Sequence, residues 1–220
     1  MWTRTLIARR CSAGVRRHPD SMDSRLPFPA LPRGKAALQA GIVYAIDGGD
    51  GHIFYGQVSR TSGIGFFRHR STFLEPVEAV AAGVMSRFGV NRQSIGRAVR
   101  AGAWLKLGRF DLHPDLAQDP LLVQWPVGTL RVSVWQGDAV IRETMVHDPT
   151  IQALEVIASY DAIDHVPSRL RADFTQPNDA WKVGGTVWRE RRLKEDLATR
   201  FPDMPSHKLP PGWLPTHDGV

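Results

Sequence analysis

The sequence contains only one cysteine, Cys11. A single cysteine excludes an intramolecular disulfide, so the fold does not need an oxidising compartment for its stability. It also means that the rest of the chain has no thiol nucleophile. These features fit a cytoplasmic protein, which is the location we predict.

Long apolar runs are also absent. No stretch approaches the roughly 20 apolar residues that cross a bilayer, and the apolar residues 6–8 are too few for a signal-peptide core. Arg9 and Arg10 precede a polar segment, which does not match a twin-arginine export signal. We therefore expect neither export nor a membrane partner.

Recognisable catalytic and metal-binding motifs are missing as well. The chain has no G-x-S-x-G elbow, no Walker A loop and no G-x-G-x-x-G, and its eight histidines form no H-x-H or H-x-x-x-H pair. His147-Asp148 and Asp164-His165 pair a base with an acid, but such pairs are typical of helix starts and turns, where they cap backbone groups. We therefore predict no catalytic residue, metal site or cofactor from these motifs.

The positive charge is concentrated at the N-terminus. The chain has 28 Lys and Arg against 22 Asp and Glu, a net charge of +6, and a pI of about 10.0. Residues 1–35 hold eight of the basic and two of the acidic residues, so the remainder carries twenty of each sign. The basic pI therefore belongs to this segment, and we expect no nucleic-acid partner for the folded body.

Three regions follow from composition. We interpret residues 1–35 as a basic, proline-containing disordered tail and linker, residues 36–201 as a single α+β domain, and residues 202–220 as a proline-rich C-terminal tail. The first 17 residues have the Arg-rich, acid-poor composition of a transit peptide. The alternative is an over-extended start, with translation beginning at Met22, so the presence of residues 1–23 in the mature protein stays open.

Strand patterns dominate the central region. Gly and Asp residues at 48–51 supply the positive φ angles of a hairpin turn, and Gly137-Asp138 forms a second tight turn. β-branched and aromatic residues predict strands over 41–47, 52–59, 63–69, 121–125, 129–135, 139–146 and 185–188. Apolar spacing predicts helices over 76–82, 148–157 and 189–201, the last with a solvated charged face.

These patterns predict an α+β fold. We expect a mainly antiparallel curved sheet, or a partly open β-barrel, of six or seven strands with two or three peripheral helices. The sequence leaves the oligomeric state open.

Residues 81–100 allow a second interpretation. They resemble a helix-turn-helix with Gly89 at the turn, Asn91 as cap of the second helix, and Val90 and Ile95 as buried positions. The residues expected to face base edges or phosphates are Arg92, Gln93, Ser94 and Arg97. Four glycines weaken such helices, at about 1 kcal/mol for each interior glycine, and residues 84–90 alternate as a strand does. A DNA-binding regulator is therefore the alternative function.

A family resemblance covers somewhat under half of the chain. Residues 41–46, Tyr55-Gly-Gln-Val, the Phe66-Phe67 strand and residues 102–108, followed by a Val/Trp strand, resemble the immunity protein 26 family of bacterial polymorphic toxin systems. The resemblance makes residues 84–90 a strand. It implies a non-enzymatic cytoplasmic protein that binds and neutralises a cognate toxin domain.

An immunity protein works by covering a surface of its toxin. Interface energy is concentrated in Trp, Tyr and Arg, so the candidate partner-binding residues are Tyr55, Arg97, Arg100 and Trp104. For Trp104 a core position is the competing interpretation. The sequence does not identify the toxin or its activity.

Overall fold

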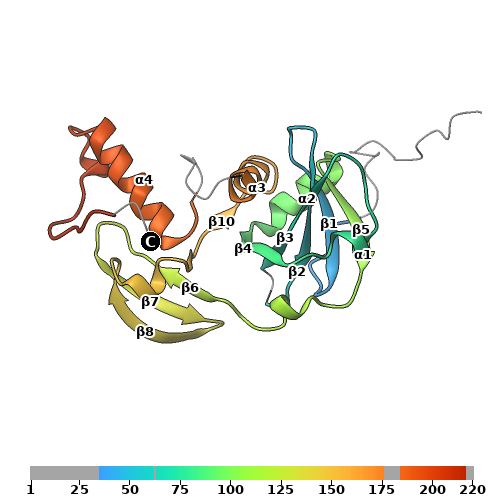
Figure 1. The fold of residues 1–220 in the computed structure, drawn as a ribbon, viewed down its shortest axis with the longest axis horizontal. Coiled ribbons are helices and arrows are strands. Elements are labelled where there is room, and N and C mark those ends of the chain that lie inside the picture. The colour runs from blue at the N-terminus through green and yellow to red at the C-terminus, as the bar shows by residue number, and fades with distance from the viewer. Residues whose placement is uncertain (1–34, 62, 176–183, 217–220) are drawn as a thin grey trace, which may run out of the picture.

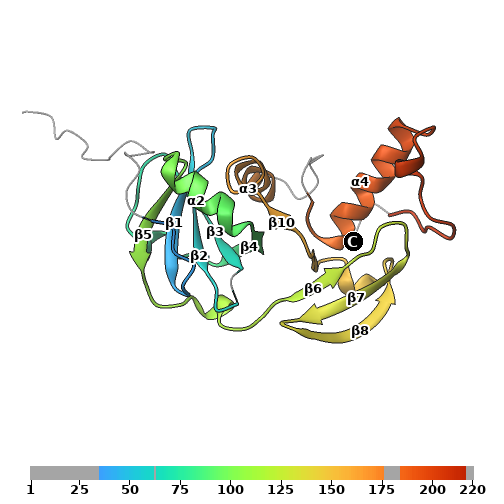
Figure 2. The same ribbon diagram turned by 180° about the vertical axis from the view of Figure 1, so that it is seen from behind.

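The computed structural model describes residues 35–61, 63–175 and 184–216. They form two lobes, each built on its own β-sheet (Figure 1). The first lobe contains a six-stranded sheet in the order β10-β4-β3-β2-β1-β5, and the second a four-stranded sheet in the order β8-β7-β6-β9. The reverse view shows the same division, with helix α3 above the seam between the lobes (Figure 2).

The six-stranded sheet is antiparallel apart from one parallel pair, β10 with β4. Its strands are β1 Ile42–Asp47, β2 Ile53–Val58, β3 Ile64–Ser71, β4 Val84–Val90, β5 Trp104–Arg109 and β10 Ser159–Tyr160. The predicted hairpin is confirmed: β1 and β2 pair directly, and Gly49 and Gly51 in the turn have φ angles of 71° and 83°.

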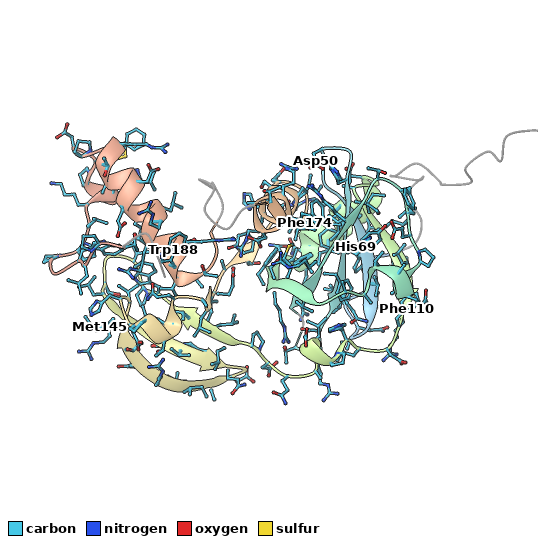
Figure 3. The ribbon with its side chains drawn as sticks, viewed as in Figure 1. Asp50, His69, Phe110, Met145, Phe174 and Trp188 are labelled. Atoms are coloured by element: carbon cyan, nitrogen blue, oxygen red, sulfur yellow. The ribbon has the colours of Figure 1, made fainter. Side chains whose placement is uncertain are left out.

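Both faces of this sheet are covered. Helices α2 (Arg92–Arg100) and α3 (Val166–Thr175) pack on one face, where Tyr44, Phe54 and Phe66 are fully buried. The short helix α1 (Val77–Val80) covers part of the other face. Figure 3 shows Phe174 of α3 in this lobe, where its ring lies edge-on to Phe54 with the centroids 6.1 Å apart. The sheet is thus held by packing on two sides.

The four-stranded sheet carries the second core. Its strands are β6 Leu121–Gln124, β7 Arg131–Gln136, β8 Ala139–Met145 and β9 Glu155–Val156. Helix α4 (Val187–Arg200) begins in this core with the buried Val187. Figure 3 shows Met145 on the sheet and Trp188 on the helix. Three 3₁₀ turns complete the described elements, η1 Pro114–Leu116, η2 Pro149–Ile151 and η3 Pro205–His207.

The predicted α+β class and curved sheet are confirmed. The six-stranded sheet curls into half a barrel, with helices on its surface. The division into two sheets was not anticipated. Strands β6, β7 and β8 were predicted correctly, but they form a separate sheet instead of extending the first one.

The predicted helix over 148–157 is wrong. Asp148 caps a single 3₁₀ turn by accepting a hydrogen bond from the backbone N–H of Thr150 at 2.8 Å. The chain then extends, because Glu155 and Val156 pair with β6 in parallel and the N–H of Ile157 donates to the carbonyl of Val123 at 2.8 Å. Neighbouring strand edges therefore override the helical spacing of the apolar residues.

The predicted strand over 185–188 is also wrong. Only Thr186 makes a bridge, to Glu155, and helix α4 starts at the next residue. The N–H groups of Val187 and Trp188 donate to the carbonyls of Leu154 and Gln152. These bonds satisfy the first donors of the helix, so residues that pattern as a strand begin a helix instead.

The charged face of α4 is partly buried, contrary to expectation. Arg191 is only 5% exposed and donates to the side-chain oxygen of Gln152 at 2.8 Å and to the carbonyl of Leu214 at 2.7 Å. Glu195 accepts from the indole N–H of Trp213 at 2.9 Å and from the backbone N–H of Thr216 at 2.7 Å. These side chains hold residues 202–216 against the second lobe.

Candidate functional site: the interlobe cleft

A cleft of about 560 Å³ lies between the two sheets. One wall is the end of β4 and the first turn of α2, and the opposite wall includes Pro120 and Leu122 of the second lobe. Residues 155–159 run from β9 to β10 and form the floor. Its volume lies within the range of ligand-binding pockets, roughly 300–1,000 Å³, so we take this interlobe cleft as the candidate site.

The α2 wall is positioned by a helix cap. The side-chain oxygen of Asn91 accepts from the backbone N–H groups of Gln93 at 2.9 Å and Ser94 at 3.2 Å, as an N-cap residue does. The Ser94 hydroxyl in turn accepts from the N–H of Ala162 at 2.9 Å. These bonds fix the first turn of α2 beside the segment that follows β10, and they place Arg92 and Gln93 at the cleft.

The floor is held from both lobes. Ile157 is bonded to β6 in the second lobe, while the N–H of Asn91 donates to the carbonyl of Tyr160 at 2.9 Å in the first. Gly89 lies directly against the floor, because a Cβ atom at this position would come within 2.8 Å of the Ala158 carbonyl oxygen. Only a residue without a side chain allows this approach.

A buried charged cluster lies behind the floor. Arg169 on α3 is 1% exposed and donates to both carboxylate oxygens of Glu155, at 3.0 and 2.9 Å, and to both of Asp173, at 2.9 and 2.8 Å. It also donates to the hydroxyl of Tyr160 at 3.0 Å. Arg189 of α4 pairs with Asp173. We call Glu155, Tyr160, Arg169, Asp173 and Arg189 the arginine cluster.

The arginine cluster holds opposite charges in contact away from water. Burial raises the pKa of Glu155, and the ion pair and hydrogen bonds with Arg169 oppose that rise. Burial alone would lower the pKa of Arg169, but the carboxylates of Glu155 and Asp173 outweigh it and hold that pKa above its ordinary value. Burial also raises the pKa of the Tyr160 hydroxyl, so this group stays protonated. Buried ion pairs with satisfied hydrogen bonds hold a defined geometry. The arginine cluster is therefore a structural support that joins the lobes.

The charge left open to the cleft is positive. Of its charged lining residues, Glu155 is matched by Arg169, whereas Arg87 and Arg92 have no ion-pair partner within the described ranges. One terminal nitrogen of Arg87 donates hydrogen bonds to backbone carbonyls of the loop 115–118. Burial lowers its pKa, against the opposing field of Asp119. The cleft thus offers two cations beside an apolar wall.

Two of the predicted partner-binding residues lie in the core. Tyr55 is fully buried, and its hydroxyl bonds to the Ser71 hydroxyl at 3.0 Å and accepts from the N–H of Glu75 at 3.0 Å. Trp104 is 1% exposed and donates to the carbonyl of Ala162 at 3.0 Å. A partner cannot touch either side chain in the folded protein, so both are corrected to structural positions.

The other two predicted residues lie on α2, outside the cleft lining. Arg97 pairs with Asp161 at 2.5 Å while its side chain is 54% exposed. Arg100 is exposed at the last turn of the helix. Arg92, at the first turn of the same helix, is the one that reaches the cleft. The structure therefore moves the interface hypothesis from the end of α2 to its beginning.

Residues 81–100 do not form a helix-turn-helix. Residues 84–90 are strand β4, and only one helix, α2, follows. Gly89 lies inside the strand instead of at a turn between helices. The predicted cap at Asn91 and the buried positions Val90 and Ile95 are correct, because a strand-to-helix junction needs them as much as a helix pair does.

No sequence signal pointed to the other residues of this region. Arg169 belongs to helix α3, which was not predicted, and Glu155 and Ile157 were expected in a helix. Arg92 and Gln93 were identified, but as DNA contacts. A charge count cannot distinguish a buried arginine from an exposed one, so only the fold locates the cleft.

Within the ranges that the structure covers, no three His, Cys, Asp or Glu side chains gather to hold a metal ion. No helix of the described residues is long and apolar enough to cross a bilayer. Comparison with known proteins gives no matching family model, no similar curated protein and no similar solved structure.

Proposed function

We propose that this chain is an immunity protein that neutralises a cognate toxin domain by binding it at the interlobe cleft. The proposal combines a sequence resemblance with one geometric observation. That observation is the pair of arginines, Arg87 and Arg92, which line a cleft between two sheets without an ion-pair partner among the described residues.

Most of the resemblance falls on one part of the fold. Its segments between residues 41 and 108 correspond to strands β1, β2, β3 and β5, which are neighbours in the six-stranded sheet, whereas its last segment, the Val/Trp strand, is β7 of the second sheet. The cleft opens beside β4 at the end of this sheet away from β5. A scaffold of this kind supports neutralisation by occupying a surface, which requires a stable shape and complementary charge and no chemistry of its own.

The geometry of the cleft suits a protein partner. A basic site with an apolar wall binds a surface that presents carboxylates next to apolar side chains, because both kinds of contact are then satisfied. Leu122 and Ile157 supply the apolar wall, and Ile157 is 48% exposed. In this proposal the protein acts in the cytoplasm, where it meets a toxin before the toxin reaches its target.

DNA binding is the competing function, and the arginines of α2 are what favour it. Arg92 and Arg100 lie on one helix that has no acidic residue in its first turn. Phosphate contacts release counterions, so DNA affinity falls steeply as salt increases. As salt increases, the affinity for a protein partner that contacts only one or two arginines falls much less.

An immunity function predicts a cognate toxin gene beside this one. Neutralisation is tested by expressing the toxin domain of that neighbouring gene, with and without the full chain. We expect the chain to restore growth of the producing cells and to form a stoichiometric complex with the purified toxin domain. Continued toxicity together with no complex would contradict the proposal. Salt-sensitive binding to duplex DNA without toxin binding would favour the regulator instead.

A further inference from the structure

We infer that the interlobe cleft receives an extended segment of the toxin that carries a carboxylate, an inference that rests on the proposed function. The charge of the cleft, the free nitrogens of Arg87, an open strand edge and an apolar wall lead to it. The charge, the nitrogens of Arg87 and the apolar wall belong to the 560 Å³ cleft, and the open strand edge, residues 84–88, meets it at Arg87 and Phe88.

Charge comes first. The lining contains three charged side chains, Arg87, Arg92 and Glu155. Glu155 is bonded through both oxygens to Arg169, so it does not neutralise the two arginines. A ligand with a negative group gains from both cations, whereas a basic ligand is repelled.

Arg87 has unused hydrogen-bond donors. Its Nη1 donates to the carbonyl of Asp115 at 3.3 Å and to the carbonyl of Gln118. Its Nε and Nη2 are buried and bond to no atom of the described chain. A buried N–H without an acceptor costs free energy. Because these two atoms have almost no surface open to solvent, a carboxylate bonds to the guanidinium fork with its two acceptors only after the side chain turns into the cleft. The ligand that best satisfies this side chain is an Asp or Glu.

The edge of β4 is open beside these arginines. Strand β4 has seven residues, but β10 pairs only with the last two, Gly89 and Val90. No other described strand lies on that side of residues 84–88. An extended segment can therefore add to this edge through main-chain hydrogen bonds, in line with β10.

The apolar wall sets a second requirement on the ligand. Pro120, Leu122 and Ile157 line the cleft opposite and beneath the arginines. In an extended chain, residues two apart point to the same side. A segment with an acid at one position and a leucine or valine two residues later fills both parts of the cleft. A nucleic-acid backbone has no apolar group of this kind.

The test is an NMR titration of the isotope-labelled full chain with a synthetic peptide, acetyl-Thr-Val-Asp-Thr-Leu-Thr-Val-amide, and with its Asp-to-Asn counterpart. We expect amide shifts in residues 84–93, at Leu122 and in residues 155–159, and roughly ten-fold weaker binding of the Asn peptide, the loss of about one charge-assisted hydrogen bond. Arg92→Gln should weaken the Asp peptide by a similar factor, while Arg100→Gln, on the same helix outside the cleft, should not.

Several results would overturn the inference. They are no shift in the cleft at millimolar peptide, equal binding of the two peptides, or a single-stranded oligonucleotide that binds the cleft better than the Asp peptide. These outcomes are independent of the proposed function, because binding of the intact toxin is measured separately. Toxin binding without peptide binding refutes the ligand assigned to the cleft, and peptide binding without toxin binding refutes the immunity function.

Discussion

Arg169 on α3 donates from its two terminal nitrogens to the two carboxylate oxygens of Glu155 on β9, at 3.0 and 2.9 Å. The two residues belong to different lobes, and both are shielded from water, with side chains 1% and 12% exposed. The same carboxylate lines the cleft. The pair therefore joins the lobes at the floor of the candidate site and removes one negative charge from it.

Replacing Arg169 by Met should lower the free energy of unfolding. The substitution leaves the carboxylates of Glu155 and Asp173 without their main cation, and removing one partner of a buried ion pair costs about 3–5 kcal/mol. Urea denaturation measures the free energy of unfolding. The matched control is Arg200→Met, which breaks an exposed pair with Asp196 and should cost less than about 1 kcal/mol. Equal losses would refute the structural role of Arg169.

Gly89→Ala should disturb the floor of the cleft. The added methyl would lie 2.8 Å from the Ala158 carbonyl oxygen, so backbone must move. Overpacking of this kind costs roughly 1–3 kcal/mol. Gly83→Ala is the control, because its new methyl meets no described atom within 4 Å, and we expect a change within about 0.5 kcal/mol. Thermal unfolding of both variants compares them, and a neutral Gly89→Ala would contradict the close approach.

Much of the first lobe could be predicted from the sequence. The hairpin at 48–51 is local chemistry, since glycines supply positive φ angles between two apolar strands. The cap at Asn91 is local too, because a short polar side chain before a helix accepts its free N–H groups. Such features depend on a few adjacent residues, so a single sequence reveals them.

The cleft depends on long-range pairing, which the sequence does not encode locally. Strands β9 and β10 have two residues each, too few for an alternating pattern. They form because β6 and β4 present open edges to them. Arg169 likewise finds partners on β9, and no spacing rule connects residues so far apart in the chain. The helix expected over 148–157 failed for this reason.

Trp104→Phe should lower the free energy of unfolding and leave partner binding unchanged. The indole N–H donates to the carbonyl of Ala162, and the ring contacts Tyr44 with centroids 5.4 Å apart. Losing the hydrogen bond leaves that carbonyl unsatisfied, at about 1–3 kcal/mol. Chemical denaturation should show this loss, while calorimetric titration with the toxin domain should give an affinity within about two-fold of the wild type, below the tenfold change that 1.4 kcal/mol produces. A large affinity change in a folded variant would place Trp104 in the interface after all.

Acid should destabilise the second lobe through Asp148. Hydrogen bonds from the hydroxyls of Thr150 and Thr144, from the N–H of Thr150 and from Arg142 hold the pKa of Asp148 well below its ordinary value of 3.8. The folded state then binds the proton more weakly than the unfolded state. This contribution is fully present above the ordinary pKa and is lost as the pH falls through the lowered one.

The variant Asp148→Asn tests this linkage. It cannot titrate, so its free energy of unfolding should change less than that of the wild type between about pH 5 and pH 2. Urea denaturation at a series of pH values measures the difference. Parallel pH profiles for the two proteins would show that the carboxylate of Asp148 is not stabilised on folding.

The central claim is that the toxin binds where Arg92 meets the cleft. The most direct measurement is the affinity of the purified toxin domain, which the immunity hypothesis predicts to be encoded beside this gene, for the full chain and for Arg92→Glu and Arg100→Glu, by isothermal titration calorimetry. Both variants change the charge equally on one helix, but only Arg92 lines the cleft. We predict at least a roughly ten-fold loss for Arg92→Glu, because a like charge then faces the carboxylate, and little change for Arg100→Glu. Equal affinities for all three proteins would contradict the account.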